Sequence, residues 1–456
     1  MKYNDTIVAL ATAMGQAAIG TIRISGNDAL TILQQVMRPR RPGVWRPRVV
    51  RYGHIYGADN HVIDEVLAFY MPGPSSYTGE DVVEISCHGG RIAITQVLQR
   101  IIACGARSAD PGEFTMRAFV SGRIDLSQAE AVMDVIQAQT PHALRQAHAQ
   151  LDGWLRQRVE QLRHAVMYEL AAVVARIDFP DEVDETAVDR IALQRVITDI
   201  EGMISESRSG MMLRDGAKVV LIGRPNVGKS SLLNALLRHD RAIVSPIAGT
   251  TRDTLEEYAD VGGVPVRFVD TAGIRSDSTD AIEQLGIERS RAVAAEADVA
   301  LILIDASAPL TAQDYAVVQA RGDLPAILVL TKADLPPHPV TTTQAVDLRP
   351  SSFAAVVHVS TQTQSGLREL QQALTALLLD YAPPSDQRVS NARHVDALRR
   401  TALAVRDALD GLADGQTADL VAVDLQAAVA ALGEITGEDV SESVLDIVFA
   451  RFCIGK

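Results

Sequence analysis

The stretch "GRPNVGKS" at residues 223–230 constrains the fold more than any other part of this chain. It follows the apolar run "KVVLI" and precedes "SLLNALL", which predicts a buried strand, a glycine loop and a helix in direct succession. In that order, the N–H groups of the loop wrap a phosphate at the positive end of the helix. Lys229 would then neutralise the β and γ oxygens of the phosphate, and Ser230 would bind Mg²⁺. Further apolar runs alternate with helices, which predicts a mostly parallel sheet covered on both faces.

Two motifs after the phosphate loop predict how a γ-phosphate is sensed. Thr251 in "GTTRD" can complete the Mg²⁺ shell, while "DTAG" supplies Asp270 as a Walker-B-type carboxylate and Gly273 as a backbone N–H donor. Ile274 stands where Ras-type proteins have the Gln that orients water, and an Ile side chain cannot hydrogen-bond water. Glu283 follows the loop "RSDSTD", and it either swings toward the phosphate or is an ordinary surface carboxylate.

Two later motifs predict a guanine site. "TKAD" holds Thr331, Lys332 and Asp334, and its carboxylate can accept from the N1–H and 2-amino groups of guanine. Thr331 stands where Asn is commoner, and "STQ", with Ser360 and Thr361, replaces the commoner Ser-Ala-Lys, so we expect moderate to low nucleotide affinity. The residues expected to contact GTP are Asn226, Val227, Gly228, Lys229, Ser230, Ser231, Ser245, Gly249, Thr250, Thr251, Asp270, Thr271, Ala272, Gly273, Thr331, Lys332, Asp334, Ser360 and Thr361.

The chain of 456 residues is long enough for several domains. Short β-type runs with turn signals predict an α+β domain over residues 1–120. Apolar residues at spacings of three and four predict a helical part over 121–216, broken near Pro141. The α/β pattern covers 217–379, and residues 380–456 are helical again. The two helical parts would form one discontinuous domain into which the α/β unit is inserted.

Composition excludes some classes of function. The net charge of −14 argues against indiscriminate binding of nucleic acid, and the arginine-rich segment at residues 38–51 is read either as a solvated loop or as an RNA contact. The three cysteines, Cys87, Cys104 and Cys453, form neither a zinc pattern nor a disulfide framework. No apolar window is long enough for a membrane helix, so we expect a cytoplasmic protein without a membrane partner.

The motifs together resemble one family over essentially the whole chain. The matching stretches are "DTIVALATA", "TIRISG", "SYTGEDVVEISCHGG", "PGEFTMRAF", "GRIDLSQAEA", "IDFPDE", the nucleotide motifs, "NARH" and "GEITGEDVSESVLDIVFARFCIGK". They resemble the bacterial tRNA modification GTPases called MnmE or TrmE. The resemblance implies a multidomain α/β protein: an α+β tetrahydrofolate-binding and dimerisation domain, a discontinuous all-helical domain and an inserted Ras-like P-loop GTPase domain.

The resemblance also implies partners and a reaction. The family forms a homodimer and works with the FAD-dependent protein MnmG, as a heterotetramer, on C5 of the wobble uridine of certain tRNAs. It uses 5-formyl- or 5,10-methylene-tetrahydrofolate, and GTP hydrolysis drives its conformational change.

The resemblance further implies two metal ions and a catalytic carboxylate. No arginine finger is evident, and a monovalent cation held by the side-chain oxygen of Asn226 could replace its charge. By resemblance, Glu283 would position the attacking water, although one extra residue separates it from "DTAG". Mg²⁺ would be held by Ser230 and Thr251. K⁺, which activates hydrolysis in the family, would be held by Asn226, Ser245, Ile247 and Thr250.

The resemblance places folate contacts on Arg23, Glu80, Arg123 and Lys456. A pterin ring presents adjacent N–H donors to a carboxylate such as that of Glu80, which would otherwise be read as a turn residue, and cations suit the glutamate carboxylates of folate. Cys453 is read either as a thiolate that assists one-carbon transfer or as a small apolar plug. The ending "CIGK" fails as a prenylation signal because Gly455 is not aliphatic.

Two other classes of function compete with this interpretation. An assembly factor could use the same GTPase motifs to time its binding to the ribosome or to RNA, without covalent chemistry. It would usually carry a basic RNA-binding domain instead of a folate-type one. A stand-alone folate transferase would leave the inserted GTPase domain unexplained.

Overall fold

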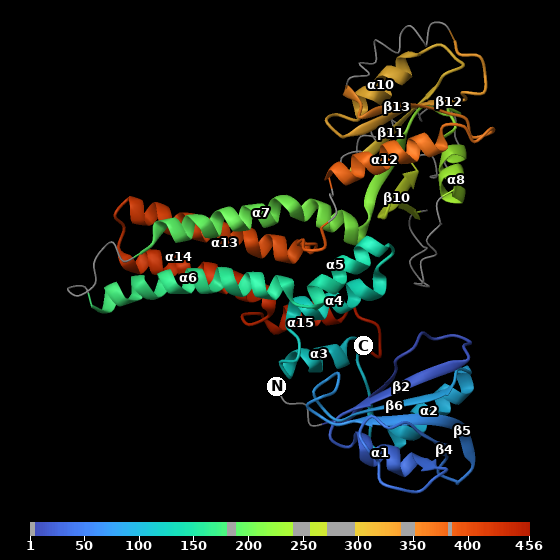
Figure 1. The fold of residues 1–456 in the computed structure, drawn as a ribbon, viewed down its shortest axis with the longest axis vertical. Coiled ribbons are helices and arrows are strands. Elements are labelled where there is room, and N and C mark those ends of the chain that lie inside the picture. The colour runs from blue at the N-terminus through green and yellow to red at the C-terminus, as the bar shows by residue number, and fades with distance from the viewer. Residues whose placement is uncertain (1–4, 180–187, 240–255, 271–296, 339–351, 382–384) are drawn as a thin grey trace. The chain divides into compact units, whose positions relative to one another are not determined.

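The computed structural model describes residues 5–179, 188–239, 256–270, 297–338, 352–381 and 385–456 (Figure 1). The chain divides into two compact units. Unit 1 contains Met1–Met133, Leu151–Arg163 and Ala430–Lys456, and unit 2 contains Asp134–Gln150 and His164–Val429. Both ends of the chain therefore belong to unit 1, because the chain leaves this unit and returns to it.

An antiparallel sheet forms the N-terminal part of unit 1. In the part of the chain that the structure describes, this sheet has seven strands in the order β3-β4-β5-β6-β2-β1-β7, and only the pair β1 and β7 is parallel. Alternate residues of the strands pack with α1 and α2 into one apolar cluster, which explains the alternation in the sequence. The elements are β1 (Ile7–Leu10), β2 (Ile19–Ser25), α1 (Ala29–Val36), β3 (Met37–Pro39), β4 (Arg51–Tyr56), β5 (Val62–Met71), β6 (Val82–His88), α2 (Arg91–Ala103), β7 (Arg107–Ser108) and α3 (Glu113–Val120).

The C-terminal segment is packed into unit 1. Helix α15 (Glu442–Phe449) and the residues after it contribute Phe449 and Phe452 to a buried cluster with Leu126 and Met133 of α4 (Leu126–Gln137). The Phe449 and Phe452 rings have centroids 5.4 Å apart. Phe452 is 6% exposed, whereas Ile454 is 61% exposed, so only the phenylalanine serves as a plug.

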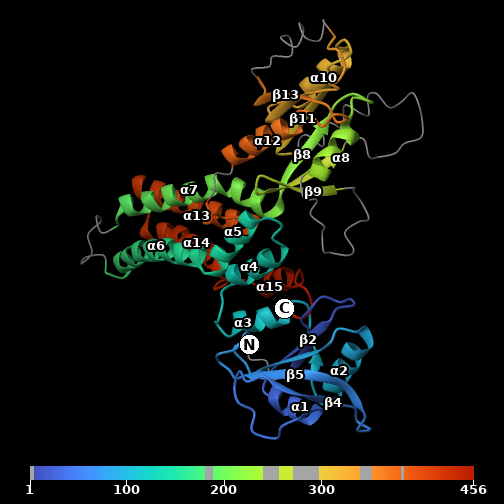
Figure 2. The same cartoon turned by 45° about the vertical axis from the view of Figure 1, so that its right-hand side comes forward.

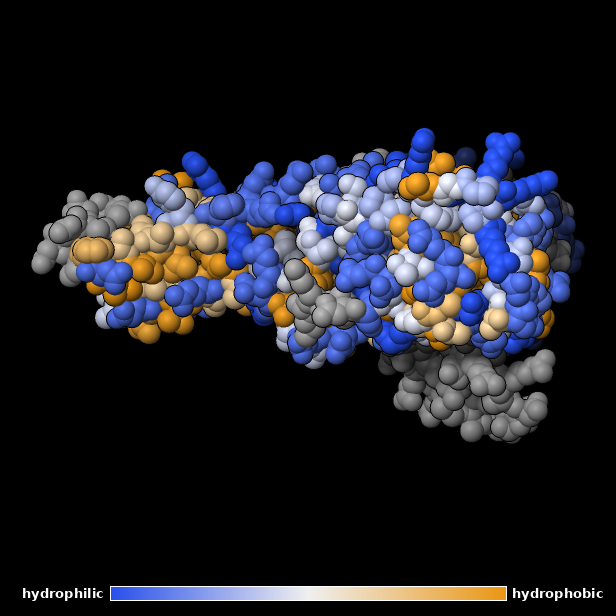
Figure 3. Space-filling model, turned by 90° about the horizontal axis from the view of Figure 1, so that it is seen from below, coloured by the Kyte–Doolittle hydropathy of each residue, from blue (hydrophilic) through white to orange (hydrophobic). Residues whose placement is uncertain are grey.

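Long helices connect the two units. The predicted break near Pro141 is found, because α5 (Pro141–Leu151) begins at that proline and α6 (Trp154–Asp178) follows. The carboxylate of Asp189 accepts from two N–H groups at the start of α7 (Arg190–Asp215), and α7 lies along α13 (Ala392–Ala413) (Figures 1 and 2). Helix α14 (Ala418–Thr436) is the next long helix along the chain after α13. The outer part of α6 exposes Met167, Val174 and Ile177, and Figure 3 shows apolar side chains along this end of the bundle.

The inserted domain in unit 2 contains the mostly parallel sheet that the sequence predicts. Among the residues the structure describes, six strands take the order β13-β12-β11-β8-β10-β9, and only β9 and β10 pair antiparallel. The elements are β8 (Ala217–Ile222), α8 (Lys229–His239), β9 (Glu256–Val261), β10 (Val264–Asp270), β11 (Val299–Asp305), α10 (Ala312–Ala320), β12 (Ala326–Thr331), β13 (Ala355–Val359) and α12 (Leu367–Tyr381).

Two apolar clusters cover the two faces of this sheet. Val219 and Leu221 of β8 pack with residues of α8 and α12, while Val220 and Ile222 of the same strand pack with residues of α10. Both faces of β8 are thus buried, which is why its sequence is continuously apolar. The predicted fold class, a multidomain α/β protein with an inserted P-loop domain, is confirmed.

The plug formed by Phe452 can be tested by truncation. We expect Phe452→Ala to lower the free energy of unfolding by about 3–5 kcal/mol, because it removes a large buried side chain and leaves a cavity. Denaturant unfolding followed by circular dichroism measures this change. Ile454→Ala is the matched control and should change stability by less than about 0.5 kcal/mol. Equal effects of the two substitutions would contradict the assignment of Phe452 as the anchor.

Candidate functional site

The phosphate loop of unit 2 joins the end of β8 to the start of α8. Gly228 has φ +102°, and Asn226 has φ +61°, a value that Asn tolerates better than most residues. The ammonium of Lys229 donates to the carbonyl oxygens of Gly223 at 2.7 Å and of Arg224 at 2.9 Å. The loop is therefore a curved segment with its lysine on the inside, which is the arrangement that phosphate binding requires.

The predicted base loop lies beside the phosphate loop. The hydroxyl of Thr331, which is 4% exposed, lies 2.8 Å from the carbonyl oxygen of Val227 and 3.2 Å from that of Ile304. Thr331 thus braces the base loop on the phosphate loop with its own hydroxyl, in the place where Asn is commoner. Asp334 is exposed, while Ser360 is buried and its Oγ accepts from Thr363 N at 3.2 Å.

Asp305, at the end of β11, is a residue of this site that the motifs do not reveal. Its carboxylate lies 2.7 Å from the ammonium of Lys332 and accepts from the N–H and hydroxyl of Ser307. Burial raises the pKa of Asp305, but the hydrogen bonds from Lys332 and Ser307 outweigh it, so the pKa lies below its ordinary value. Asp305 therefore remains ionised at neutral pH and holds the ammonium of Lys332 in place.

The other residues predicted to contact GTP or metal ions lie partly inside and partly outside the described ranges. Ser231 is exposed on α8, and Thr361 is half-buried after β13. Among the residues in the described ranges, no group of three or more His, Cys, Asp or Glu could hold a metal ion. Asp270 ends β10, and its side chain lies outside what the structure describes. Ser245, Ile247, Gly249, Thr250, Thr251, Thr271, Ala272, Gly273 and Glu283 also lie outside the described residues.

The four residues predicted to bind folate come together in unit 1. Arg23 of β2 faces Glu84 of β6, and the register of the two strands places them opposite each other, with Nε 2.9 Å from Oε1. The guanidinium of Arg23 also lies 3.4 Å from the carbonyl oxygen of Gly455. The last residues of the chain thus lie on the sheet, and Lys456 is half-buried there. Glu84 lies in the matching stretch "SYTGEDVVEISCHGG", but the sequence did not single it out, because its pairing with Arg23 depends on strand register.

Tyr77 is a second residue of this site to which the sequence assigned no role, although it lies in the matching stretch "SYTGEDVVEISCHGG". The guanidinium of Arg23 lies 5.2 Å from the centroid of the Tyr77 ring, and that of Arg123 lies 5.1 Å from the same centroid. Arg123 also donates to the carbonyl oxygen of Tyr77 at 2.6 Å. One aromatic ring therefore holds two of the predicted folate-binding cations in place.

Lys456 is placed in an environment that disfavours its charge. Burial and the positive charge of Arg23 lower its pKa, and the nearby Glu84 and Cys453 oppose this shift only in part. Gly455 has φ +95°, and a Cβ there would lie 2.2 Å from the carbonyl oxygen of Leu10. The tail can approach β1 this closely only with glycine at that position. Cys453 is exposed, which does not fit the reading of it as a small apolar plug.

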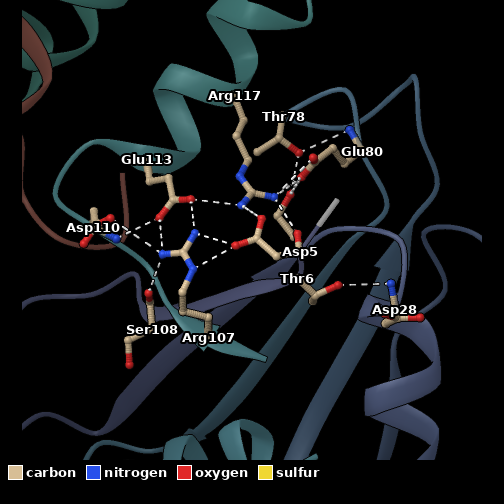
Figure 4. A network of polar contacts seen from close by, with 11 residues as sticks. Asp5, Thr6, Asp28, Thr78, Glu80, Arg107, Ser108, Asp110, Glu113 and Arg117 are labelled. Atoms are coloured by element: carbon tan, nitrogen blue, oxygen red, sulfur yellow. Dashed lines mark hydrogen bonds and ion pairs between the residues drawn. The ribbon is translucent and has the colours of Figure 1, made fainter. Parts of the chain in front are cut away.

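Glu80 is held by a buried network of charges (Figure 4). Both of its oxygens accept from Nη1 of Arg117, at 3.2 and 3.1 Å, and the hydroxyl of Ser25 donates to it at 2.7 Å. Ser25 and Arg23 are two residues apart on β2 and share a face, which brings Glu80 to the Arg23 site. Arg117 is 2% exposed, and it also pairs with Asp5 at 2.8 Å and with Glu113 at 2.9 Å.

The network determines how stability depends on pH. Burial raises the pKa of Glu113, but the hydrogen bonds from Arg107, Asp110 N and Arg117 outweigh it, and the pKa lies below the ordinary value of 4.5. Because the folded state depresses this pKa, the stabilisation is fully present above about pH 4.5 and is lost as the pH falls through the lower folded value.

Replacing Arg117 by Met should therefore have an effect that depends on pH. We expect the variant to lose about 3–5 kcal/mol of unfolding free energy at pH 7, because buried carboxylates lose their partner. The loss should shrink as the pH falls below about 4.5, where protonated carboxyls no longer need the arginine. Denaturant unfolding over a pH series measures both effects. Arg91→Met, at an exposed arginine, is the control, and a loss that stayed constant with pH would contradict the assignment.

No helix in the described part of the chain is long and apolar enough to cross a membrane. Two family models match the chain. The model described as "GTP-binding protein TrmE N-terminus" matches residues 6–123, and that described as "MnmE helical domain" matches residues 126–453.

Curated relatives extend this likeness along the whole sequence. The "tRNA modification GTPase MnmE" of Chloroflexus aurantiacus is 50% identical and covers 99% of this chain and 100% of its own. Proteins with the same name from Roseiflexus sp. and Lactiplantibacillus plantarum are 49% and 42% identical, and they cover 100% and 99% of this chain and 100% and 98% of their own. The family membership predicted from the motifs is confirmed: the chain belongs to the MnmE family of tRNA modification GTPases.

Proposed function

We propose that this protein hydrolyses GTP and, with an FAD-dependent partner of the MnmG type, modifies C5 of the wobble uridine in certain tRNAs. The product carries an aminomethyl or carboxymethylaminomethyl group, and a tetrahydrofolate supplies the one-carbon unit. The observation that carries this proposal is the meeting of Arg23, Glu80, Arg123 and Lys456 in one site, in a chain that also has a phosphate loop.

The nucleotide half of the proposal uses the loops at the ends of β8 and β12. Lys229 would exchange the carbonyl oxygens of its own loop for phosphate oxygens, and Asp334 would select guanine. Thr331 joins the two loops through the hydrogen bond from its hydroxyl to the carbonyl oxygen of Val227. Mg²⁺ would be held by Ser230 and Thr251 and would neutralise charge on the phosphates.

The catalytic half of the nucleotide site follows from the family. Asn226 lies in the phosphate loop with φ +61°. With Ser245, Ile247 and Thr250 it would hold K⁺, which supplies positive charge where no arginine finger is evident in the sequence. Glu283 would then orient the attacking water, a role that Ile274 cannot fill.

The chemistry of the side chains in unit 1 fits a folate. Arg23, Arg123 and Lys456 would bind its glutamate carboxylates, and Glu80 would accept from adjacent N–H donors of the pterin. Glu80 is already oriented by Arg117, so it would lose little freedom on binding. Cys453 is exposed on the same tail, and we propose that it contributes to one-carbon transfer.

An assembly factor that acts on RNA without covalent chemistry remains the alternative. The convergence of the C-terminal tail with Arg23 favours the modification enzyme, because an assembly factor has no need for a site for folate. The family relation extends the proposal to a homodimer through the N-terminal domain. The family relation also supports the proposal that the domains of the chain are residues 1–120, 121–216, 217–379 and 380–456.

Activation by potassium is the first test of the nucleotide proposal. We expect GTP turnover to be at least about tenfold faster in K⁺ than in Na⁺ at equal ionic strength, because a missing arginine finger is worth about 10³ or more in rate. Phosphate release measures the turnover. Glu283→Ala is the control and should lose turnover in both salts while it still binds GTP. Equal wild-type rates in the two salts would reject the K⁺ site.

The second test examines modification itself. In cells that lack the protein, mass spectrometry of wobble uridines should find the modification missing, and the full chain should restore it. A chain without Cys453–Lys456 should hydrolyse GTP at the wild-type rate but restore little modification, because the tail completes the folate site. Wobble uridines that keep their modification in cells without the protein would refute the function. Full restoration by the shortened chain would show that the tail contributes to packing and not to the modification reaction.

A further inference from the structure

The arginine-rich segment at residues 38–51 is not used by either proposed site. It holds six arginines and three prolines, and it contains no acidic residue, in a chain whose net charge is −14. Five of the six are exposed and one is half-buried. They are Arg38, Arg40, Arg41, Arg46, Arg48 and Arg51.

None of these arginines forms an ion pair with a carboxylate among the described residues. Arg51 donates to the carbonyl oxygens of Gly43 and Arg41, and Arg48 donates to that of Ser75. These acceptors are neutral, so the positive charge of the segment is not compensated. Arg23, Arg107 and Arg117 in the same unit are instead paired with acids.

Aromatic rings lie beside the guanidinium groups. That of Arg38 lies 4.3 Å from the centroid of Tyr56, and that of Arg40 lies 5.9 Å from the centroid of Tyr52. On the core side of the sheet, the guanidinium of Arg51 lies 5.0 Å from the centroid of Trp45. Such contacts hold guanidinium planes in fixed directions without neutralising their charge.

The aromatic residues form a row on one face of β4. Tyr52, His54 and Tyr56 are two residues apart, so they point to the same side, opposite to Ile55 in the core. Their rings meet edge to face, with centroids 5.8 and 6.4 Å apart. All three are half-buried, so part of each ring reaches solvent.

The loop that follows β3 is held by its backbone. Arg40 N donates to the carbonyl oxygen of Tyr52 at 3.0 Å, and Arg48 N donates to that of Tyr70 at 2.7 Å. Trp45 packs against the apolar cluster of the sheet. The loop therefore presents Arg41 and Arg46, whose side chains form no hydrogen bond or ion pair in the described residues, from a fixed base.

We propose that residues 38–51 and the aromatic row of β4, together called the arginine strip, contact the phosphate backbone of RNA. This inference rests on the proposed function, in which the RNA is tRNA. Six uncompensated guanidiniums repel one another, and phosphates relieve that repulsion with release of counterions. Planar arginines and exposed ring edges additionally suit the faces of unstacked bases.

A simpler role for the charges explains only part of the strip. Charged residues on an edge strand prevent two sheets from pairing, and β3 is an edge strand. That role applies to Arg38 but not to Arg41 and Arg46, which lie in the loop beyond β3. An anionic membrane would attract the same charges, and the vesicle measurement below separates it from RNA.

The test compares two double variants of the full chain. Arg41→Gln with Arg46→Gln removes two charges of the strip whose side chains form no hydrogen bond or ion pair in the described residues. Arg195→Gln with Arg399→Gln removes two exposed arginines of α7 and α13 that have no carboxylate partner in the described residues. Binding of fluorescently labelled tRNA is measured by anisotropy over a series of salt concentrations.

We expect the strip variant to bind tRNA at least about tenfold more weakly near 0.1 M salt, with the slope of log affinity against log salt smaller by about 2. The control pair should behave like the wild type. Equal affinities for all three proteins would overturn the proposal, as would the absence of any tRNA binding by the wild type at low salt. Binding of phosphatidylserine vesicles, but not tRNA, through the same arginines would also overturn it.

Two readouts in the same samples separate this proposal from the proposed function. GTP turnover and the oligomeric state should be unchanged in the strip variant, because both substitutions lie in unit 1 and the nucleotide loops belong to unit 2. If the wild type bound tRNA through the strip but hydrolysed no GTP, the proposed function would fail while the strip would stand.

Discussion

The buried guanidinium of Arg117 is the interaction on which unit 1 depends. Removing an arginine from water is costly, and the cost is offset here by carboxylates from three different segments: Asp5, Glu80 and Glu113. Each partner comes from a separate part of the chain, so one side chain ties the N-terminal strand, the loop before β6 and α3 together. The orientation of Glu80, and with it one side of the candidate folate site, follows from this arrangement.

The return of the chain to its starting unit is the second constraint. Phe452 fixes the last helix on α4, and only then can Gly455 approach β1 and Lys456 reach Arg23. The tail is therefore positioned by the packing of Phe452 together with the glycine at position 455. The inserted domain in unit 2 is connected to this tail through α14, so the chain joins its two candidate sites covalently.

Sequence reasoning succeeded where chemistry is local. The phosphate loop and the base loop each lie within a few consecutive residues. A continuous run of apolar residues predicts that a strand such as β8 is buried on both faces. It failed for Glu84, Tyr77 and Asp305, which are single residues in strands and turns. Glu84 becomes a partner of Arg23 only through the register of β2 and β6, which no motif encodes. Asp305 likewise meets Lys332 because β11 and β12 are neighbours.

The sequence by itself determined the class of fold, the family and the nucleotide loops, because these depend on local spacing, periodicity and short motifs. It also placed the arginines of residues 38–51 together. Only the tertiary structure decided which charges are compensated. Arg117 and Arg23 are paired with acids that lie far away in the chain, whereas the arginines of the strip are not. Coulombic pairing depends on distance in space, and that distance is set by packing and strand register.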